Sequence, residues 1–355
     1  MTLLQTFRVP ELVTGTGYDS RLGRAMIRAW RVDGVFQIVL PAGRQTAVRD
    51  ALAAGRRFFA LPESVKNRCV SDLSYSGYAA ATTAAEALPE SFTVCKDVPL
   101  DDARVLARWP CHGPVPWPAD PEHRRAVNAC LAVLGSLGDR LLKLAALGLG
   151  TADGEELTSC TFDGWHHARL VRHPPAGTGA RTGHGLLMLT AQQRPGGLAV
   201  RPPVRGEKRY RNWLAEESTT GMYEDEPPWT EVDPEPGPGP RTLTVLPGDL
   251  MQYLTHGTLP ATPYRMLPRA AGRIVLDYFH EPNFAACLRP LGTAAATATG
   301  GAASPPFLHY GSHFTHLFAR RHPDRGTTRR IIAEERLAVL DDLRYTAGRP
   351  AFEVC

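Results

Sequence analysis

Apolar residues recur at helical spacing through the first third of the chain. One such face carries Leu22, Met26, Ala29 and Trp30 and predicts a helix that closes at Asp33-Gly34. A short apolar strand is expected at residues 35–40, and a second helix at residues 45–61, where Pro62 stops it. A long helix is expected after the proline-rich stretch 109–118. Its apolar stripe comprises Val127, Leu131, Leu134, Leu141 and Leu144.

From about residue 160 the pattern changes to the alternation that is typical of strands. Short β-runs separated by Gly/Pro turns are predicted at residues 167–173, 184–191, 198–201, 241–246, 251–255 and 273–280. Several short strands at this spacing favour a sandwich or a barrel. Residues 224–240 and 293–306 are predicted to be loops, and a final helix at about 328–343 is expected to pack back on the barrel.

Composition and charge serve mainly to exclude several classes of protein. A chain of 355 residues can bury a large core, and a formal net charge of +4 without a block of like charge does not favour nucleic-acid or membrane-surface binding. No long apolar run and no signal pattern occurs, so neither a membrane span nor a secretion signal is expected. The seven cysteines are odd in number and scattered, which favours a reduced, cytoplasmic protein.

Several segments identify a family. They are residues 74–78 (Ser-Tyr-Ser-Gly-Tyr), 92–97 (Phe-Thr-Val-Cys-Lys-Asp), 163–167 (Asp-Gly-Trp-His-His) and 278–284 (Tyr-Phe-His-Glu-Pro-Asn-Phe). Over nearly its whole length the chain resembles the bacterial ethylene-forming enzymes, which are 2-oxoglutarate- and Fe(II)-dependent oxygenases of the isopenicillin-N-synthase-like group. The resemblance implies a mainly β fold: a double-stranded β-helix, or jelly roll, with flanking helices. We expect one compact unit with a helical region at 1–158, the jelly-roll core at 159–290 and a C-terminal part at 291–355.

The resemblance also says where the iron ligands should lie. In the family a His-x-Asp pair opens one barrel strand and a second His lies on a later strand, which together form a facial triad. The matching positions here are Arg181, Gly183 and Tyr264. A guanidinium about 4 Å from a divalent ion would be repelled by roughly 8 kcal/mol at an effective dielectric near 20. We therefore expect that the family's iron site is absent and that no metal cofactor is needed.

The anion-binding residues of the family are retained. By the resemblance, Arg273 matches the arginine that holds 2-oxoglutarate, and Arg169 and Arg320 match arginines near the amino-acid substrate. Guanidinium groups suit carboxylates, so 2-oxoglutarate or another small carboxylate is expected as the ligand. The alternative is that these are inherited surface or ion-pair arginines. Thr190 and Phe279 are the other residues predicted to contact substrate.

Polar residues are expected inside the barrel. Strand alternation places Asp277 on the same face as Arg273 and Phe279, and His173 on the face of Arg169. Three interpretations stay open, because a buried carboxylate must be paired. Asp277 belongs to an acid–base site, or it forms an ion pair with Arg273 that fills the emptied space. In the third interpretation His173, His184 and Asp277 form a relocated metal site.

Three further stretches carry less weight. His166 and His167 also occur in the family without being ligands there, so we expect a structural role. The His-x-Asp motif at 322–324 matches an ordinary family segment, so it is not interpreted as a metal-binding site. Residues 79–88 are shorter than the family's counterpart and contain a single acid, Glu86, which puts the use of L-arginine as substrate in doubt.

The leading hypothesis from the sequence is a metal-independent enzyme on the dioxygenase scaffold. It would perform non-oxidative acid–base chemistry on a small carboxylate or amino-acid-like metabolite. Proton transfer is assigned to His184, Asp277, His173 and Tyr264, and charge stabilisation to Arg181. The alternatives are a 2-oxoglutarate-dependent oxidoreductase with a relocated metal site and a non-catalytic ligand-binding protein.

Overall fold

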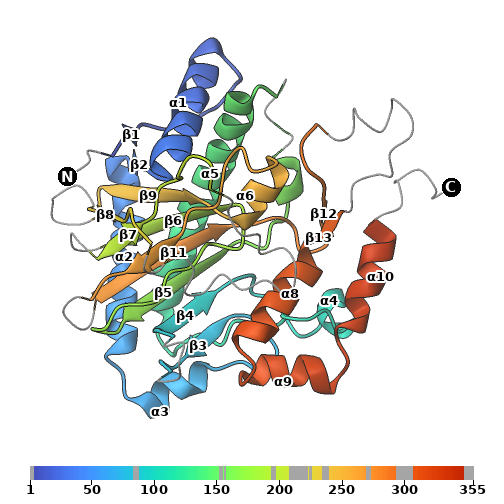
Figure 1. The fold of residues 1–355 in the computed structure, drawn as a ribbon. Helices are drawn as coiled ribbons and strands as arrows, with labels where there is room; N and C mark the ends of the chain where they lie inside the picture. Colours follow the sequence, from blue (N-terminus) through green and yellow to red (C-terminus); the bar gives the residue numbers. More distant parts are fainter. Residues whose placement is uncertain are drawn as a thin grey trace.

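The computed structural model describes residues 4–82, 88–151, 155, 157–192, 197–207, 223, 226–233, 240–268, 273–292 and 307–347. Two β-sheets face each other, and helices cover the outer face of the larger one (Figure 1). This is the predicted jelly roll with flanking helices. The predicted loop at 293–306 lies outside the described residues, as do Glu86 and parts of 224–240.

The larger sheet has eight strands. In spatial order they are β1 (Thr6–Phe7), β2 (Phe36–Val39), β9 (Thr242–Pro247), β6 (Leu187–Gln192), β11 (Arg273–His280), β5 (His167–His173), β4 (Glu90–Val94) and β3 (Gly77–Ala79). Only the β1–β2 pair is parallel among these described strands. The facing sheet has the order β10 (Tyr264–Met266), β7 (Leu198–Val200) and β8 (Thr230–Val232), and β12 (Cys287–Leu288) pairs with β13 (Leu308–His309).

The N-terminal helices have clear sequence signals at their ends. α1 (Gly17–Asp33) begins with a reciprocal capping box between Thr16 and Asp19 and ends at Gly34, whose φ of 73° is left-handed. α2 (Ala42–Phe59) follows, and α5 (Pro121–Leu149) is capped by Asp120. These three helices pack on the outer face of the larger sheet (Figure 1). The other helices are α3 (Glu63–Lys66), α4 (Ala103–Leu106), α6 (Asp249–Leu254), α8 (Tyr310–Arg321), α9 (Gly326–Ala333) and α10 (Ala338–Ala347).

The two faces of β11 belong to two different cores. Leu276 and Tyr278 pack in the large cluster under the helices, whereas Val275 and Phe279 belong to the smaller cluster between the two sheets. Strand alternation produces this division. The interior between the sheets is therefore the barrel interior, and it is the face to which Asp277 points.

Some predicted elements are wrong. Residues 251–255 are not a strand, because α6 begins at Asp249, whose amide donates to the Gly183 carbonyl at 2.7 Å. The predicted final helix is divided into α9 and α10, which Glu335, with a φ of 51°, separates. The predicted loop at 224–240 contains strand β8 (Thr230–Val232). The sequence pattern also missed the short elements β1, β3, β4, β10, β12, β13, α3 and α4, and the helix α8. Among the described residues, no helix combines the length and apolarity needed to cross a bilayer.

Candidate functional site

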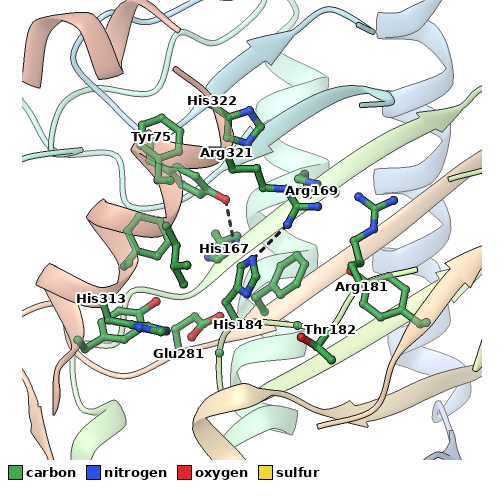
Figure 2. Close-up of a pocket in the computed structure, with 18 residues that line it drawn as sticks. Tyr75, His167, Arg169, Arg181, Thr182, His184, Glu281, His313, Arg321 and His322 are labelled. Atoms are coloured by element: carbon green, nitrogen blue, oxygen red, sulfur yellow. Dashed lines mark hydrogen bonds between the residues drawn. The ribbon is translucent and has the colours of Figure 1, made fainter. Parts of the chain in front are cut away.

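A cavity of about 70 Å³ lies between the barrel and α8. Its walls come from the 181–185 loop, β10, the end of β11 and α8 (Figure 2). Arg181, Gly183, His184 and Tyr264 all line it, so the structure does bring these sequence-predicted residues together. Phe279 and Arg169 complete part of the wall.

Arg181 and Tyr264 face each other across an isolated antiparallel bridge. The Arg181 amide donates to the Tyr264 carbonyl at 3.0 Å, and the Tyr264 amide donates to the Arg181 carbonyl at 2.8 Å. The guanidinium lies 5.9 Å from the centroid of the Tyr264 ring, a cation–π distance. Both side chains are buried, so a fixed positive charge faces this part of the cavity.

His184 is held between a carboxylate and a guanidinium. Its Nδ1 lies 3.2 Å from Oδ2 of the fully buried Asp249. Its Nε2 lies 3.1 Å from Nη1 of Arg321 (Figure 2). Because a guanidinium can only donate, Nε2 is the acceptor and Nδ1 carries the proton that is donated to Asp249. Burial lowers the pKa of His184, and Asp249 opposes that shift. His184 therefore presents a lone pair toward the cavity.

Asp277 is buried in the barrel but does not line this cavity. Its Oδ1 accepts a hydrogen bond from the Thr190 hydroxyl at 2.8 Å, and Arg169 is its cross-strand partner on β5. Burial raises the pKa of Asp277, whereas Arg169, Thr190 and Arg181 act to lower it. The predicted Asp277–Arg273 ion pair is not formed, since the described residues include no salt bridge of Asp277 within 4.0 Å.

His173 and Arg273 are cross-strand neighbours deeper in the barrel. Neither ring nitrogen of His173 has a hydrogen-bond partner among the residues that the structure describes. Burial lowers the pKa of His173 to about 3, and Arg181, Arg169 and Arg273 add to the shift. His173 is thus a neutral imidazole in a positive environment. The guanidinium of Arg273 lies against Gly197, where an added Cβ would be 2.2 Å from Nη1.

Of the remaining residues that were predicted to contact substrate, some line the cavity and others do not. Phe279 and Arg169 line the cavity, whereas Thr190 is buried behind it as the partner of Asp277. Arg320 is exposed on α8, and its neighbour Arg321 lines the cavity instead. Helical geometry turns successive residues by about 100°, so a one-residue displacement decides which arginine points inward.

Three residues of the site were missed by the sequence reasoning: Asp249, Arg321 and Glu281. Glu281 is buried with its carboxylate against Gly185, where an added Cβ would lie 1.9 Å from Oε1. Burial raises the pKa of Glu281 to about 8, so the carboxyl is largely protonated at neutral pH. A signal was available, because an acid directly follows the apolar strand 273–280 within a segment that carries the family resemblance.

Metal-ligand candidates occur in two places. In the cavity His184 has a suitable tautomer, because metal-binding imidazoles donate their other nitrogen to a carboxylate or carbonyl. Within the described residues, the single group of three donors whose ligand atoms lie within 4.8 Å of one another is Asp139, His166 and His280. The relocated site of His173, His184 and Asp277 is therefore not such a group. The cavity as it stands does not fit a three-ligand iron site.

The Asp139, His166 and His280 group has the donor types of a facial triad. His280 Nε2 lies 3.2 Å from Asp139, and the two imidazole rings stack with centroids 4.0 Å apart. One observation separates the group from the cavity, and another bears on its readiness to bind a metal. His280 points to the helix side, against Gly138 of α5, whereas its neighbour Phe279 points into the barrel. In addition, the Glu281 amide donates to His166 Nδ1 at 2.9 Å, which leaves the proton on Nε2.

Comparisons with known proteins bear directly on this geometry. Residues 11–120 match the family described as non-haem dioxygenase in morphine synthesis N-terminal. The chain is 45% identical, over 97% of its length and 100% of the relative, to the 2-oxoglutarate-dependent ethylene/succinate-forming enzyme of Ralstonia nicotianae. A putative 2OG-Fe(II) oxygenase family protein from Caulobacter crescentus is 18% identical with a TM-score of 0.69, covering 90% of this chain and 100% of that one. The dioxygenase for auxin oxidation from rice is 19% identical with a TM-score of 0.59, covering 92% of this chain and 99% of that one. These two structures confirm the fold.

Two expectations are therefore wrong. The metal-independent, non-oxidative acid–base reaction is contradicted by the full-length identity to a relative named for its dependence on 2-oxoglutarate. The expectation that no metal cofactor is needed is contradicted by the same identity and by the presence of a His/His/Asp group among the described residues. Similarity spread over the whole chain outweighs three substituted positions as evidence for the class of reaction.

Proposed function

Because the chain belongs to the 2-oxoglutarate-dependent dioxygenase family, we propose that it is an oxidoreductase that consumes 2-oxoglutarate and releases succinate. The observation that carries the proposal is the positively charged barrel interior in a chain of 45% identity to a 2-oxoglutarate-dependent relative. Fe(II) is the metal that family membership implies. Arg181, Gly183 and Tyr264 take the positions that the resemblance gives to its ligands, so these positions offer an iron ion neither a histidine nor a carboxylate.

The chain's own residues supply binding and orientation. Arg273 would hold the distal carboxylate of 2-oxoglutarate, as the resemblance implies, with Arg169 and Arg181 adding positive charge around the buried Asp277. Charge-assisted bonds from guanidinium groups to carboxylates are among the strongest in proteins. The Asp249–His184 pair would orient an acceptor nitrogen at the cavity wall, and Arg321 occupies that nitrogen in this structure.

Turnover with Fe(II), oxygen and 2-oxoglutarate tests the function. Succinate release, with or without ethylene, is the expected result, and the absence of both succinate and 2-oxoglutarate binding would refute the proposal. Arg273→Ala is expected to weaken 2-oxoglutarate binding at least about tenfold. Arg125→Ala, an exposed arginine on α5, is the matched control.

The place of the metal is a separate question with its own experiment. Iron content is measured for His280→Ala and for His184→Ala. Loss of iron in His280→Ala alone would place the ion at the Asp139, His166 and His280 group, whereas loss in His184→Ala alone would place it in the cavity. The first result would support the relocated-metal interpretation, although with different residues from those predicted.

A further inference from the structure

A second, larger cavity adjoins the first one. Its volume is about 340 Å³, and Arg169, Arg321 and His322 line both cavities. One wall is the hairpin of β3 and β4, and the opposite wall is the turn between α8 and α9. A ligand in this outer cavity would lie beside Arg169, one of the arginines around the barrel interior in which Arg273 would hold 2-oxoglutarate. That is where the second substrate of such an enzyme would lie.

The charge of the outer cavity is strongly positive. Four arginines and one acid are found in its described lining: Arg169, Arg321, Arg325, Arg329 and Asp324. Four guanidinium groups less one carboxylate give a net charge of +3. His322 stays neutral, because burial lowers its pKa well below the usual value and the surrounding arginines lower it further. The described part of the hairpin wall contributes no acid to this lining.

Three of these arginines pair with no carboxylate of the described residues. Within the described part of the chain, no salt bridge involves Arg169, Arg325 or Arg329, although most other ion pairs of this protein join arginines to acids. Nε of Arg169 and Nη2 of Arg325 are buried and make no hydrogen bond. Each guanidinium has an aromatic ring nearby, at 6.0 Å for Arg169 and 5.5 Å for Arg325. A cation–π contact replaces only part of the lost hydration.

Buried and unpaired cations are costly unless an anion is supplied. Arg330, the neighbour of Arg329 on α9, shows the ordinary structural arrangement, since it pairs with Asp72 and Glu334. Arg169 and Arg325 depart from that arrangement, because each has a buried guanidinium nitrogen without a hydrogen bond. The exposed Arg329 lines the same cavity. A bound anionic ligand therefore explains the unpaired arginines better than a structural role does.

We propose that the outer cavity binds an anionic second substrate, with a carboxylate held by Arg325 and Arg329, and that it rejects a guanidinium-bearing amino acid. The proposal rests on the proposed function, because it takes 2-oxoglutarate to be held by Arg273 in the barrel interior. A second cation would add to the net charge of +3 that the described lining residues carry, whereas a carboxylate would neutralise part of it.

The test uses the full chain with saturating 2-oxoglutarate under anaerobic conditions. L-Glutamate and L-arginine are the probes, since they share an α-amino acid group and differ in side-chain charge. Calorimetric titration is expected to give a dissociation constant for L-glutamate at least about tenfold lower than that for L-arginine. Equal affinity, or tighter binding of L-arginine, would overturn the proposal.

Variants locate the binding. Arg329→Gln and Arg325→Gln are each expected to weaken L-glutamate binding about fivefold or more, whereas Arg330→Gln should leave it within about twofold. Arg329 is exposed, so its variant is expected to fold even where the Arg325 variant does not. Unchanged L-glutamate affinity in Arg329→Gln would refute the assignment.

The two proposals fail separately. Failure of 2-oxoglutarate to bind the wild-type chain would refute the proposed function. The preference between L-glutamate and L-arginine is then measured without 2-oxoglutarate, and it still decides whether the outer cavity selects anions.

Discussion

The buried carboxyl of Glu281 should make the stability of this protein fall as pH rises through neutrality. Burial raises the pKa of Glu281 from 4.5 to about 8. Below about pH 4.5 the carboxyl is protonated in both the folded and the unfolded chain, so it contributes no pH dependence. Between about pH 4.5 and pH 8 the unfolded chain ionises first and binds fewer protons, and the folded state is progressively disfavoured.

The magnitude follows from the same pKa difference. Each pH unit in that window removes about 1.4 kcal/mol, so the full effect approaches about 5 kcal/mol as an upper bound. Glu281→Gln keeps the shape of the side chain and removes the ionisation. Its unfolding free energy should therefore be less pH-dependent than that of the wild type, and its relative stability should improve as pH rises from about 5 to about 8.

Urea denaturation at four pH values spaced across this window measures the difference. Glu122→Gln, at an exposed position on α5, is the matched control and should follow the wild-type profile. Parallel profiles for the wild type and Glu281→Gln would refute the reasoning, because they would show that the Glu281 carboxyl is not held in its protonated form.

Three further predictions concern packing and polar contacts. Gly23→Ala should destabilise by about 1–3 kcal/mol, because the new Cβ would lie 2.1 Å from the Leu144 carbonyl of α5. Gly43→Ala in α2, where the added Cβ meets no atom within 4 Å, should not destabilise the protein in the same urea titration. Tyr78→Phe removes the hydroxyl that donates to Glu90 at 2.8 Å and should cost about 1–2 kcal/mol, whereas Tyr18→Phe on the surface should cost nothing measurable. Asp249→Asn should lower the pKa of His184 further, since Asp249 is the group that opposes the effect of burial. An unchanged His184 titration by NMR would contradict the Asp249–His184 pairing.

The candidate site was predictable where one strand or one loop contains it. Alternation along residues 273–280 placed Asp277 and Phe279 on one face, the resemblance made that face the barrel interior, and the structure agrees. The resemblance placed Arg181 and Tyr264 together, and they line one cavity. Partners that come from distant segments were not predicted. Asp249 reaches His184 only because the start of α6 packs on the 183–185 loop.

The sequence by itself determined the family, the jelly-roll fold and most of the helices and strands. Those features depend on periodicity, on capping residues such as Thr16 and Asp120, and on similarity spread over the whole chain. Local physical preferences act over a few residues, so a sequence displays them directly.

Only the tertiary structure determined which charged side chains lie close together around one cavity or in one cluster. It placed Asp139, His166 and His280 on the helix side of the sheet and left Arg169, Arg325 and Arg329 around one cavity without an acid to pair them in the described residues. These relations join residues that are far apart in the chain. They depend on strand register and helix rotation, where a shift of one residue turns a side chain from one face to the other.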